Sequence, residues 1–571
     1  MTLMLAMVSI YVQAQNNDIT EYRNSFPEEH VAILANSQIL LSGQTLQFKI
    51  TCSTKNNQKA ISDMAYVELV SNDKKGVFLY KIHLENSVAS GDFFLPSTLK
   101  TGHYKLIAYT NLTLNNDEGA FDEEDIYIIN PYLNAVENDL KHSFSETERY
   151  IEISKVDNLH IVDQNESHGL KILTDFKSYP KRAKVQLKIQ NNLNNSNFGN
   201  YSISVKKIDS IEVQKHYIEN EQNIEIRPIK ALPEMRGELI QGAVVDSRTN
   251  KPAANQSVSI SIGGDDYVYK STRTNLDGHF YFNLFETHEQ ENAIIQVVTE
   301  SREDYALEIF HDDFPYYDYL SFYPVKLDEN LKNYIESNSI YNQVESAYYS
   351  LKMDSINETL PAKSFYGEPD VVYFLDDFKR FPTVRETFIE VIEDAAIRST
   401  NEGFKFLVYD IDIHFQGILD NHEPLLIMDG IQIQDKNIVV EYNPNLIESV
   451  SLVKGIYSVG SNIYNGIIDI KLKKPRDFKL TGSFLKEIDI IKPIASKSYF
   501  NPEYENNVDK QNRTPDFRTQ LLWLPSLDLN SSLHTIEFYT SDITGYYQVE
   551  LNGIAADGKA VHLTSIFEVT K

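Results

Sequence analysis

The stretch LLSGQTLQFKI at residues 40–50, followed by AYVELV at residues 65–70, shows the pattern that decides the fold. In both segments polar and apolar side chains alternate, so that every second side chain can face a buried layer while the others face water. A polar turn from Asn72 to Gly76 follows, and residues 77–84 alternate again. Short amphipathic runs separated by turns predict a β-sandwich.

The bulk composition extends this prediction to the whole chain. With 571 residues the chain is too long for one core, so we expect several domains. It contains 35 Tyr and 29 Phe but only 23 Gly, which favours a mainly β protein. A formal net charge of −29 repels phosphate backbones, so we expect no nucleic-acid partner.

The chain contains a single cysteine, Cys52, which excludes an intramolecular disulfide. Cys52 lies in the alternating run LQFKITCS. Its position predicts a small buried strand residue rather than a reactive thiol.

The N-terminal run TLMLAMVSIYV has the length of a signal peptide and is too short to span a bilayer. Val12 and Ala14 stand at −3 and −1 of a cleavage site after Ala14. We therefore expect residues 1–14 to be a signal peptide and the protein to be periplasmic or associated with the outer membrane. The basic segment that normally precedes such a run is missing, which leaves open that the numbering starts inside a longer chain.

Residues 28–132 contain LLSGQTLQFKI, AYVELV, ENSVASGDFFLPSTLKTGHYKLIAYTN and DIYIINP. Through these segments, and above all through the strand from Gly102 to Asn111, they resemble the MG2 domain of α2-macroglobulin-like proteins. Residues 133–232 resemble the next macroglobulin-type sandwich through LKILTDFKSYPKRAKVQLKIQ, although the polar stretch 134–168 could equally be a linker. Residues 500–571 resemble a late macroglobulin-like sandwich, through Phe538 to Tyr547 and the turn at Gly553 to Gly558. The resemblance implies three separate sandwiches.

Residues 236–300 resemble the carboxypeptidase regulatory-like β-sandwich. LIQGAVVDSRTNKPAANQSVSI supplies a strand and a turn, and Asn275-Leu276-Asp277-Gly278 turns into the alternating run HFYFNL. Such modules carry no peptidase site of their own. Residues 301–363 are acidic and aromatic, and LDENLKNYIESNSIYNQVESAYYSLK within them has apolar residues near helical spacing, which predicts an irregular connector with one or two helices.

Residues 364–476 change in pattern. FPTVRETFIEVIEDAAI (381–397) predicts a helix, FKFLVYDIDI a strand, and PLLIMDGIQI a hairpin that turns at Asp429-Gly430. NPNLIESVSLVKG predicts a short helix and a strand, and GIIDIKLKK a last strand. We expect one independent core, with these members: Phe388, Ile392, Leu426, Ile427, Val450, Val453, Ile468 and Ile470.

This segment resembles the plug domain of TonB-dependent receptors, through PLLIMDG, NPNLIESV, VKG and NGIIDI. A transporter of that family needs a membrane barrel of many amphipathic strands after the plug. The residues after Lys474 lack that repeated pattern, so we expect a plug-like domain without the barrel. The resemblance implies an outer-membrane partner, such as a barrel or a transport or secretion complex.

No residue pattern predicts catalysis. Cys52 is followed by Ser53-Thr54, not by the Gly-Glu-Gln of a macroglobulin thioester, and no HExxH zinc motif occurs. Ser458 is one residue out of register for a nucleophile elbow, and the motif-like pairs Ser71/Lys74 and Lys100/Thr101 fall inside a predicted sandwich. We therefore expect a non-enzyme with no catalytic, cofactor-binding or metal-binding residues and no cofactor.

A few weaker patterns remain open. Asp122-Glu123-Glu124-Asp125 could hold Ca²⁺ but lacks the spaced ligands of a dedicated loop, so a solvated strand start is the favoured interpretation. Asp265-Asp266, Asp312-Asp313 and the pair His160/His168 are weaker candidates for metal ligands. Asp209-Ser210-Ile211 and Asp354-Ser355-Ile356 resemble an O-glycosylation sequon of some Gram-negative bacteria.

The fold class we predict is mainly β, with serial immunoglobulin-like or macroglobulin-like sandwiches and one plug-like α/β module. The function we predict is non-catalytic binding of other proteins or peptides in the cell envelope. The alternative is a macroglobulin-like protease-binding or defence protein without a thioester. An enzyme with a site at a domain junction is a third hypothesis, which no motif supports.

Overall fold

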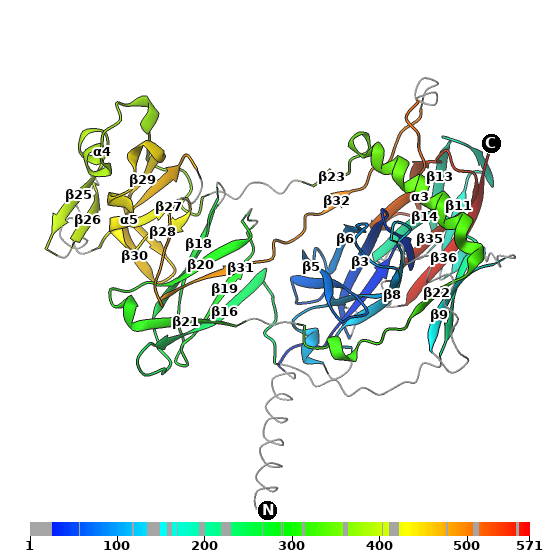
Figure 1. The fold of residues 1–571 in the computed structure, drawn as a ribbon, viewed down its shortest axis with the longest axis horizontal. Helices are drawn as coiled ribbons and strands as arrows, with labels where there is room; N and C mark the ends of the chain where they lie inside the picture. Colours follow the sequence, from blue (N-terminus) through cyan, green and yellow to red (C-terminus); the bar gives the residue numbers. More distant parts are fainter. Residues whose placement is uncertain are drawn as a thin grey trace, which may run out of the picture. The chain divides into compact units, whose positions relative to one another are not determined.

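The computed structural model divides the chain into two compact units, which are described separately (Figure 1). The first unit holds Met1–Met235, Phe314–Glu358 and Ile494–Lys571, and the second holds Arg236–Asp313 and Thr359–Pro493. The structure describes residues 25–55, 58–116, 119–133, 149–156, 163–167, 169–192, 200–217, 230–264, 267–286, 288, 290–310, 314–357, 364–401, 403–409, 422–474, 478–505, 513–555 and 559–571. The predicted signal peptide therefore lies outside the described residues. The fold is mainly β, as predicted.

The first sandwich of the first unit consists of a three-stranded and a five-stranded sheet, in the orders β1-β3-β6 and β2-β8-β7-β4-β5. The three-stranded sheet contains β1 (Glu29–Ala35), β3 (Thr45–Thr54) and β6 (Val88–Phe94). The five-stranded sheet contains β2 (Ile39–Leu41), β4 (Met64–Val70), β5 (Gly76–His83), β7 (Gly102–Tyr109) and β8 (Asp122–Ile129). The short 3₁₀ helix η1 (Thr113–Asn115) connects β7 to β8. The alternating runs from 39 to 84 form strands where the sequence predicts them, and Phe48 and Leu69 are fully buried between the sheets.

The second sandwich combines two parts of the chain that the sequence analysis assigned to different domains. Its sheets have the orders β10-β11-β13-β34 and β12-β36-β35-β14-β33. The earlier part supplies β10 (Glu166–Ser167), β11 (Leu170–Thr174), β12 (Ser178–Pro180), β13 (Lys184–Asn191) and β14 (Asn200–Lys207). The later part supplies β33 (Gln520–Asp528), β34 (Leu533–Tyr539), β35 (Gly545–Ile554) and β36 (Ala560–Thr570).

The ranges 133–232 and 500–571 therefore share one core instead of forming two separate sandwiches. β13 pairs with β34, and β14 lies between β33 and β35. The buried cluster contains Leu187 and Ile203 from the earlier range together with Phe538 and Leu551 from the later one. Both sheets combine strands of the two ranges, so each range completes its sheets only with strands of the other.

A small sheet and one helix complete the first unit. The sheet has the order β15-β9-β22 and contains β9 (Tyr150–Lys155), β15 (Ile211–His216) and β22 (Val325–Leu327). The 3₁₀ helices η3 (Tyr317–Tyr319), η4 (Glu329–Leu331) and η5 (Tyr349–Leu351) flank the helix α3 (Lys332–Ala347) in the predicted connector. Asp328 caps η4, because its carboxylate accepts a hydrogen bond from the Asn330 amide. Leu331 and Ile335 bury this segment against Leu41 and Ile151.

The sandwich of the second unit is completed by a strand far along the chain. Its sheets have the orders β19-β16-β21 and β18-β17-β20-β31. The elements are β16 (Glu238–Asp246), β17 (Ser257–Ile262), β18 (Val268–Arg273), β19 (His279–Leu284), β20 (Asn292–Val297), η2 (Arg302–Asp304), β21 (Tyr305–Phe310) and β31 (Leu485–Asp489). The sandwich thus extends beyond the predicted boundary at 300, because Phe484 and Ile488 belong to its buried cluster.

The described residues of 364–476, which we call the plug-like module after the sequence resemblance alone, form a five-stranded sheet in the order β24-β29-β30-β27-β28 and a separate hairpin, β25-β26. Its elements are β24 (Val371–Phe374), η6 (Leu375–Asp377), α4 (Val384–Glu390), β25 (Ala395–Thr400), β26 (Gly403–Val408), β27 (Leu425–Met428), β28 (Ile431–Gln432), α5 (Lys436–Val440), η8 (Pro444–Leu446), β29 (Ile447–Val459) and β30 (Asn462–Leu472). The Thr383 hydroxyl accepts from the Glu386 amide and caps α4.

Two predictions for this module need correction. The helix predicted over 381–397 ends at Glu390, and residues 395–400 form strand β25 instead. Six of the eight predicted core residues lie in one buried cluster, but Ile427 and Val453 belong to a cluster on the opposite face of the sheet. The predicted turn is confirmed, because Asp429 and Gly430 both have positive φ and join β27 to β28 as a two-residue loop.

Among the described residues, no helix has the length and apolar character needed to cross a membrane.

Candidate binding surface

The carboxylates of the acidic run at 122–125 make hydrogen bonds and ion pairs within the first sandwich. Asp122 and Glu124 point toward β1, where their carboxylates accept hydrogen bonds from the backbone amides of Ile33 (2.8 Å) and Ala35 (2.7 Å). Burial raises the pKa of Glu124 to about 7. These two carboxylates therefore take the place of a missing strand partner for β1.

The other two acids of this run face the opposite side of β8. Asp125 contacts the Nε2 atom of His103 and the ammonium of Lys105, each at 2.8 Å, and lies 3.2 Å from Lys215. Burial acts to raise the pKa of Asp125, but the His103 and Lys105 contacts outweigh it and hold this pKa well below its usual range. Glu123 also pairs with Lys105, at 2.8 Å. The run is an internal charge network of the sandwich rather than a solvated strand start.

The remaining candidates divide into two groups. Cys52 is buried in β3, as predicted, and burial raises the pKa of its thiol further, so that it stays protonated. Ser458 lies within β29 opposite Ile463, and the Ser71 hydroxyl donates to the Lys75 carbonyl, so both serines occupy ordinary structural positions. His160, His168, Asp265-Asp266 and Asp312-Asp313 lie outside the described residues.

Within the described ranges, no three His, Cys, Asp or Glu side chains are grouped as a metal site would require. Of the two sequons, Ser355 is exposed and Ser210 is partly buried. The sequence predicts no catalytic, cofactor-binding or metal-binding residue. Exposed apolar surfaces are features of the described residues that a partner could bind.

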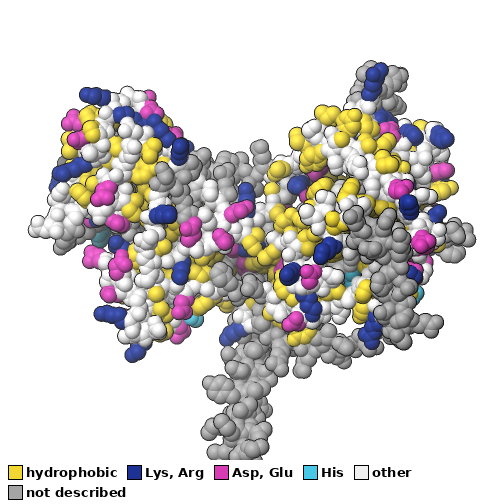
Figure 2. Space-filling view, viewed as in Figure 1, with side chains coloured by type: hydrophobic (Ala, Val, Ile, Leu, Met, Phe, Trp, Pro, Cys, Tyr) yellow, Lys and Arg dark blue, Asp and Glu magenta, His cyan; other side chains and the backbone are white. Residues whose placement is uncertain are grey.

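Among the described residues, a segment with many exposed apolar side chains follows directly on the C-terminus of α3. Five large side chains in nine residues face water, with exposed fractions from 36% to 63%: Tyr348, Tyr349, Leu351, Met353 and Ile356. We call this set the 348–356 surface. Hydrophobic side chains gather over the region between α3 and β23 (Ser355–Ile356) in the space-filling view (Figure 2). A cluster of this kind differs from the single exposed apolar residues that are normal on any protein.

The 348–356 surface is held rigidly from behind. The Lys352 ammonium, which lies between its members, contacts both Glu345 oxygens and the Pro515 carbonyl, each at 2.8 Å. The Asp354 carboxylate accepts from the Phe500 amide at 2.8 Å, and β23 pairs with β32 (Lys497–Ser498). The apolar side chains are thus displayed on a fixed backbone, which lowers the entropy lost when a partner binds.

The charges next to this surface are neutralised in pairs. Lys497 contacts the two Asp92 oxygens at 2.8 and 3.0 Å. Burial acts to lower the pKa of Lys497, but the Asp92 carboxylate outweighs it and raises this pKa. Because Lys352 is paired as well, the surface presents apolar and aromatic groups with little net charge, as in the centre of a protein interface.

Sequence reasoning missed this surface. The stretch LDENLKNYIESNSIYNQVESAYYSLK, which ends at Lys352 within this surface, was interpreted as one or two helices because its apolar residues stand near helical spacing. The missed signal is the clustering of Tyr, Tyr, Leu, Met and Ile within nine residues, after the helix has already buried its apolar face through Leu331 and Ile335.

In the second unit, one apolar face of the plug-like sheet is covered by another part of the same unit. The face of the plug-like sheet that carries Leu425, Ile427 and Ile467 is buried against Tyr267 and Tyr269 of the sandwich. This face is therefore covered within the chain.

Polar contacts fix the same junction. The Tyr267 and Tyr366 hydroxyls both donate to Asp469 Oδ2, at 2.7 and 2.6 Å, and burial raises the pKa of Asp469. The Ser259 hydroxyl and the Gln296 amide donate to the side chain and the carbonyl of Gln432, at 2.7 and 2.9 Å. Buried polar groups with specific partners of this kind fix the relative orientation of the two layers.

No protein-family model matches this sequence, and no curated protein matches it either. Solved structures similar to this one include two bacterial α2-macroglobulins. The Escherichia coli α2-macroglobulin activated by porcine elastase is 8% identical, with 95% of this chain and 44% of that chain covered and a TM-score of 0.24. The Salmonella α2-macroglobulin reacted with methylamine is also 8% identical, with 95% and 39% covered and a TM-score of 0.24.

An adhesin is also among the similar structures. The Yersinia pseudotuberculosis adhesin InvE is 12% identical, with 66% of this chain and 72% of that chain covered and a TM-score of 0.12. This chain spans less than half the length of the macroglobulins to which it is similar. Scores of this size do not assign the chain to a family.

Proposed function

We propose that this protein is a non-catalytic, exported binding protein of a Gram-negative cell envelope, and that the 348–356 surface holds a protein partner. The observation that carries the proposal is the display of five large apolar side chains on a segment fixed by Lys352 and Asp354. Tyr and Met are enriched at the centre of protein interfaces, and aromatic anchors there carry much of the binding energy.

A protein partner fits this surface better than a lipid bilayer does. The chain carries a formal net charge of −29, which anionic lipid headgroups repel. Among the described residues beside the apolar cluster, Lys352 and Lys497 are both engaged with carboxylates, so neither ammonium is free to attract such headgroups. We propose an outer-membrane barrel or a transport or secretion complex as the partner, by analogy with the plug-like pattern of the second unit.

Export can be tested directly. If residues 1–14 are a signal peptide, N-terminal sequencing of protein from the envelope fraction begins at or near Gln15. An intact Met1 on protein recovered from the cytoplasm contradicts export.

Site-specific photo-crosslinking in cells tests the binding surface. A photoreactive amino acid at Leu351 should give one dominant crosslinked product with an envelope protein. The matched control is Leu276, which is 90% exposed in a turn of the second unit and stands apart from any apolar cluster. Crosslinking from Leu276 to the same protein, or no product from Leu351, overturns the proposal. If the product from Leu351 contains a peptidase, the protease-binding alternative replaces the barrel or secretion partner.

A further inference from the structure

Strand β24 lies at the edge of the plug-like sheet. It pairs with β29 on one side, from Val371 opposite Leu452 to Phe374 opposite Ser449. On its other side, none of the described strands hydrogen-bonds to it. An edge strand presents backbone N–H and C=O groups that a further strand can use.

Edge strands in proteins are commonly protected by charges or proline. In this chain the edge strand β33 contains Pro525, and the edge strand β31 contains Lys486 and Glu487. The sequence of β24, VVYF, has neither a charged residue nor a proline. Apart from its short length of four residues, β24 therefore lacks the features that discourage pairing at the other two edges.

The side chains of β24 divide cleanly between the two faces of the sheet. Val371 and Tyr373 pack against the core of the module. Val372 and Phe374 point to the other face and are 37% and 53% exposed. The apolar cluster around Tyr267 and Tyr269 that covers that other face contains residues of β27, β29 and β30 but none of β24. An added strand would thus find both a backbone edge and an apolar surface beside it.

β24 is fixed before any partner binds. The Tyr373 hydroxyl donates to Asp394 at 2.9 Å, and the Asp370 carboxylate accepts from the Lys454 amide at 2.7 Å. Leu375 is buried directly after the strand. Because the edge is already ordered, strand addition has to order only the incoming peptide.

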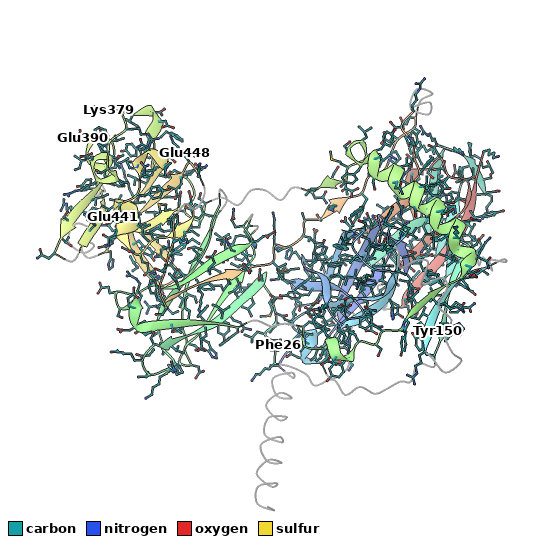
Figure 3. The ribbon with its side chains drawn as sticks, in the orientation of Figure 1. Phe26, Tyr150, Lys379, Glu390, Glu441 and Glu448 are labelled. Atoms are coloured by element: carbon teal, nitrogen blue, oxygen red, sulfur yellow. The ribbon has the colours of Figure 1, made fainter. Side chains whose placement is uncertain are left out.

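The two ends of β24 differ in charge. Glu368 and Asp370 are exposed before its start. Beyond its end, Asp376 is neutralised by Arg380 and Lys473, at 2.5 and 2.8 Å. Figure 3 places the labelled Lys379, Glu390 and Glu448 at the end of the unit that carries α4, where charges of both signs are present. Among the described residues, the start of β24 is thus the more acidic of its two ends.

We propose that β24 binds an extended peptide segment of a partner protein as a sixth strand, with apolar side chains at alternate positions and a basic residue next to Glu368 and Asp370. The inference rests on the proposed protein-binding function but uses a surface separate from the 348–356 surface. Strand addition of this kind derives affinity from main-chain hydrogen bonds and specificity from the alternate side chains.

Synthetic peptides added to the full-length protein test the proposal. The probes are peptides of about ten residues in which Val and Thr alternate, with two Lys at one end or at the other. Further probes carry two Glu in place of the Lys, or Pro at two central positions. We expect one Lys peptide to bind at least about tenfold more tightly than the matching Glu peptide and the Pro peptide not to bind. Hydrogen exchange should slow at residues 371–374 when the Lys peptide is bound.

Substitutions locate the site. Phe374→Lys and Val372→Lys each add a charge to the edge and should weaken binding at least about tenfold, with thermal melting used to verify that both variants fold. The control is Tyr281→Lys on β19, an outward aromatic residue of another edge strand that is 39% exposed, which should leave binding unchanged. Equal binding of Lys, Glu and Pro peptides, or protection outside β24, overturns the proposal. Crosslinking from Leu351 should persist in Phe374→Lys. Failure of strand addition at β24 can therefore be told apart from failure of partner binding at the 348–356 surface.

Discussion

The side chain of Gln186 in β13 donates a hydrogen bond to the Glu537 carboxylate in β34 at 2.9 Å, across 351 residues of sequence. Lys184 contacts the same carboxylate at 2.7 Å. These contacts lie on the ladder that joins the early and late parts of the second sandwich. This sandwich can close only after the chain has been made as far as β36, because its sheets contain strands from both parts.

The shared core gives the first prediction. Phe538 of β34 is fully buried among residues from both ranges, so Phe538→Ala should lower the free energy of unfolding of the first unit by about 3–5 kcal/mol. Hydrogen exchange should speed up in residues 184–207 as well as in the C-terminal strands. The control is Leu533→Ala in the same strand, where the side chain is 48% exposed and the cost should stay near 0.5 kcal/mol. Two independently folded sandwiches would instead confine the exchange effect to residues 520–570.

The Asp429-Gly430 turn gives the second prediction. Gly430 has a φ of +77°, and an added Cβ would lie 2.3 Å from Tyr267 Cβ. Gly430→Ala therefore combines backbone strain with a steric clash at the junction between the plug-like sheet and the sandwich. Gly367 has a φ of +78° with no neighbouring atom within 4 Å of an added Cβ, so Gly367→Ala should cost only the strain, about 1 kcal/mol. We expect Gly430→Ala to lower the free energy of unfolding of the second unit at least about twice as much as Gly367→Ala does, as measured by thermal melting.

Two buried lysines of the first sandwich give the third prediction. Burial lowers the pKa of Lys49 in β3 to about 7, and Asp528 offsets this only in part. Its ammonium donates to the Asn200 amide oxygen. The unfolded chain keeps its lysine protonated up to about pH 10.4, so between pH 7 and that value it binds more protons than the folded chain. The contribution of Lys49 to the free energy of unfolding therefore rises with pH in this window.

The variant Lys49→Met should remove that rise. Relative to the variant, the unsubstituted protein should gain roughly 1–3 kcal/mol between pH 7 and pH 10, measured by denaturant unfolding at each pH. The matched control is Lys105→Met. Lys105 is also buried, which acts to lower its pKa, but Glu123 and Asp125 outweigh this and raise the pKa. Lys105→Met should cost about 1–3 kcal/mol already at pH 7, because it leaves a buried carboxylate with fewer partners. If the free energy of unfolding changed with pH in the same way in the protein and in Lys49→Met, the lowered pKa of Lys49 would be contradicted.

The strands could be predicted from the sequence because polar and apolar residues alternate along them. The alternating runs at 45–50 and 65–70 form strands, although their polar residues Gln47, Lys49 and Glu68 are buried as well. The partners of those strands could not be predicted in the same way. The alternating pattern around Leu187 predicts that its side chain is buried. Nothing in the local sequence indicates that Ile536 lies opposite it on the neighbouring strand. Pairing over hundreds of residues leaves no periodic signal in either segment.

The surfaces were harder to predict than the strands. In LLIM (425–428) every side chain is apolar, so periodicity could not show that Leu426 and Ile427 face different layers. The 348–356 surface and β24 were missed for a related reason, since an apolar residue in a sequence is expected to be buried. Phe374 and Leu351 are exposed because the cores beside them are already filled, which is a property of the packing and not of the segment.

The last prediction concerns the independence of the plug-like module. The cluster around Phe388, Val450 and Ile468 gives residues 364–476 a core of their own, so this fragment should unfold in one cooperative transition with mixed α/β circular dichroism. The fragment lacks Tyr267 and Tyr269, and it therefore exposes the face of Leu425, Ile427 and Ile467 that the sandwich covers in the full chain. It should bind a dye specific for apolar surfaces, self-associate, and melt at a lower temperature than the same module in the full chain.

Removing the exposed apolar groups separates the folding of the module core from the dye binding and self-association of its uncovered face. Ile427→Thr with Ile467→Thr should reduce dye binding and self-association of the fragment, because both side chains lie on the face toward the sandwich. The same pair in the full chain should cost about 1–3 kcal/mol per residue, since there the hydroxyls are buried against Tyr267 and Tyr269. Phe388→Ala, on the other face, should instead unfold the fragment. A disordered fragment with Ile427 and Ile467 intact would show that the core around Phe388 folds only when the sandwich covers the opposite face.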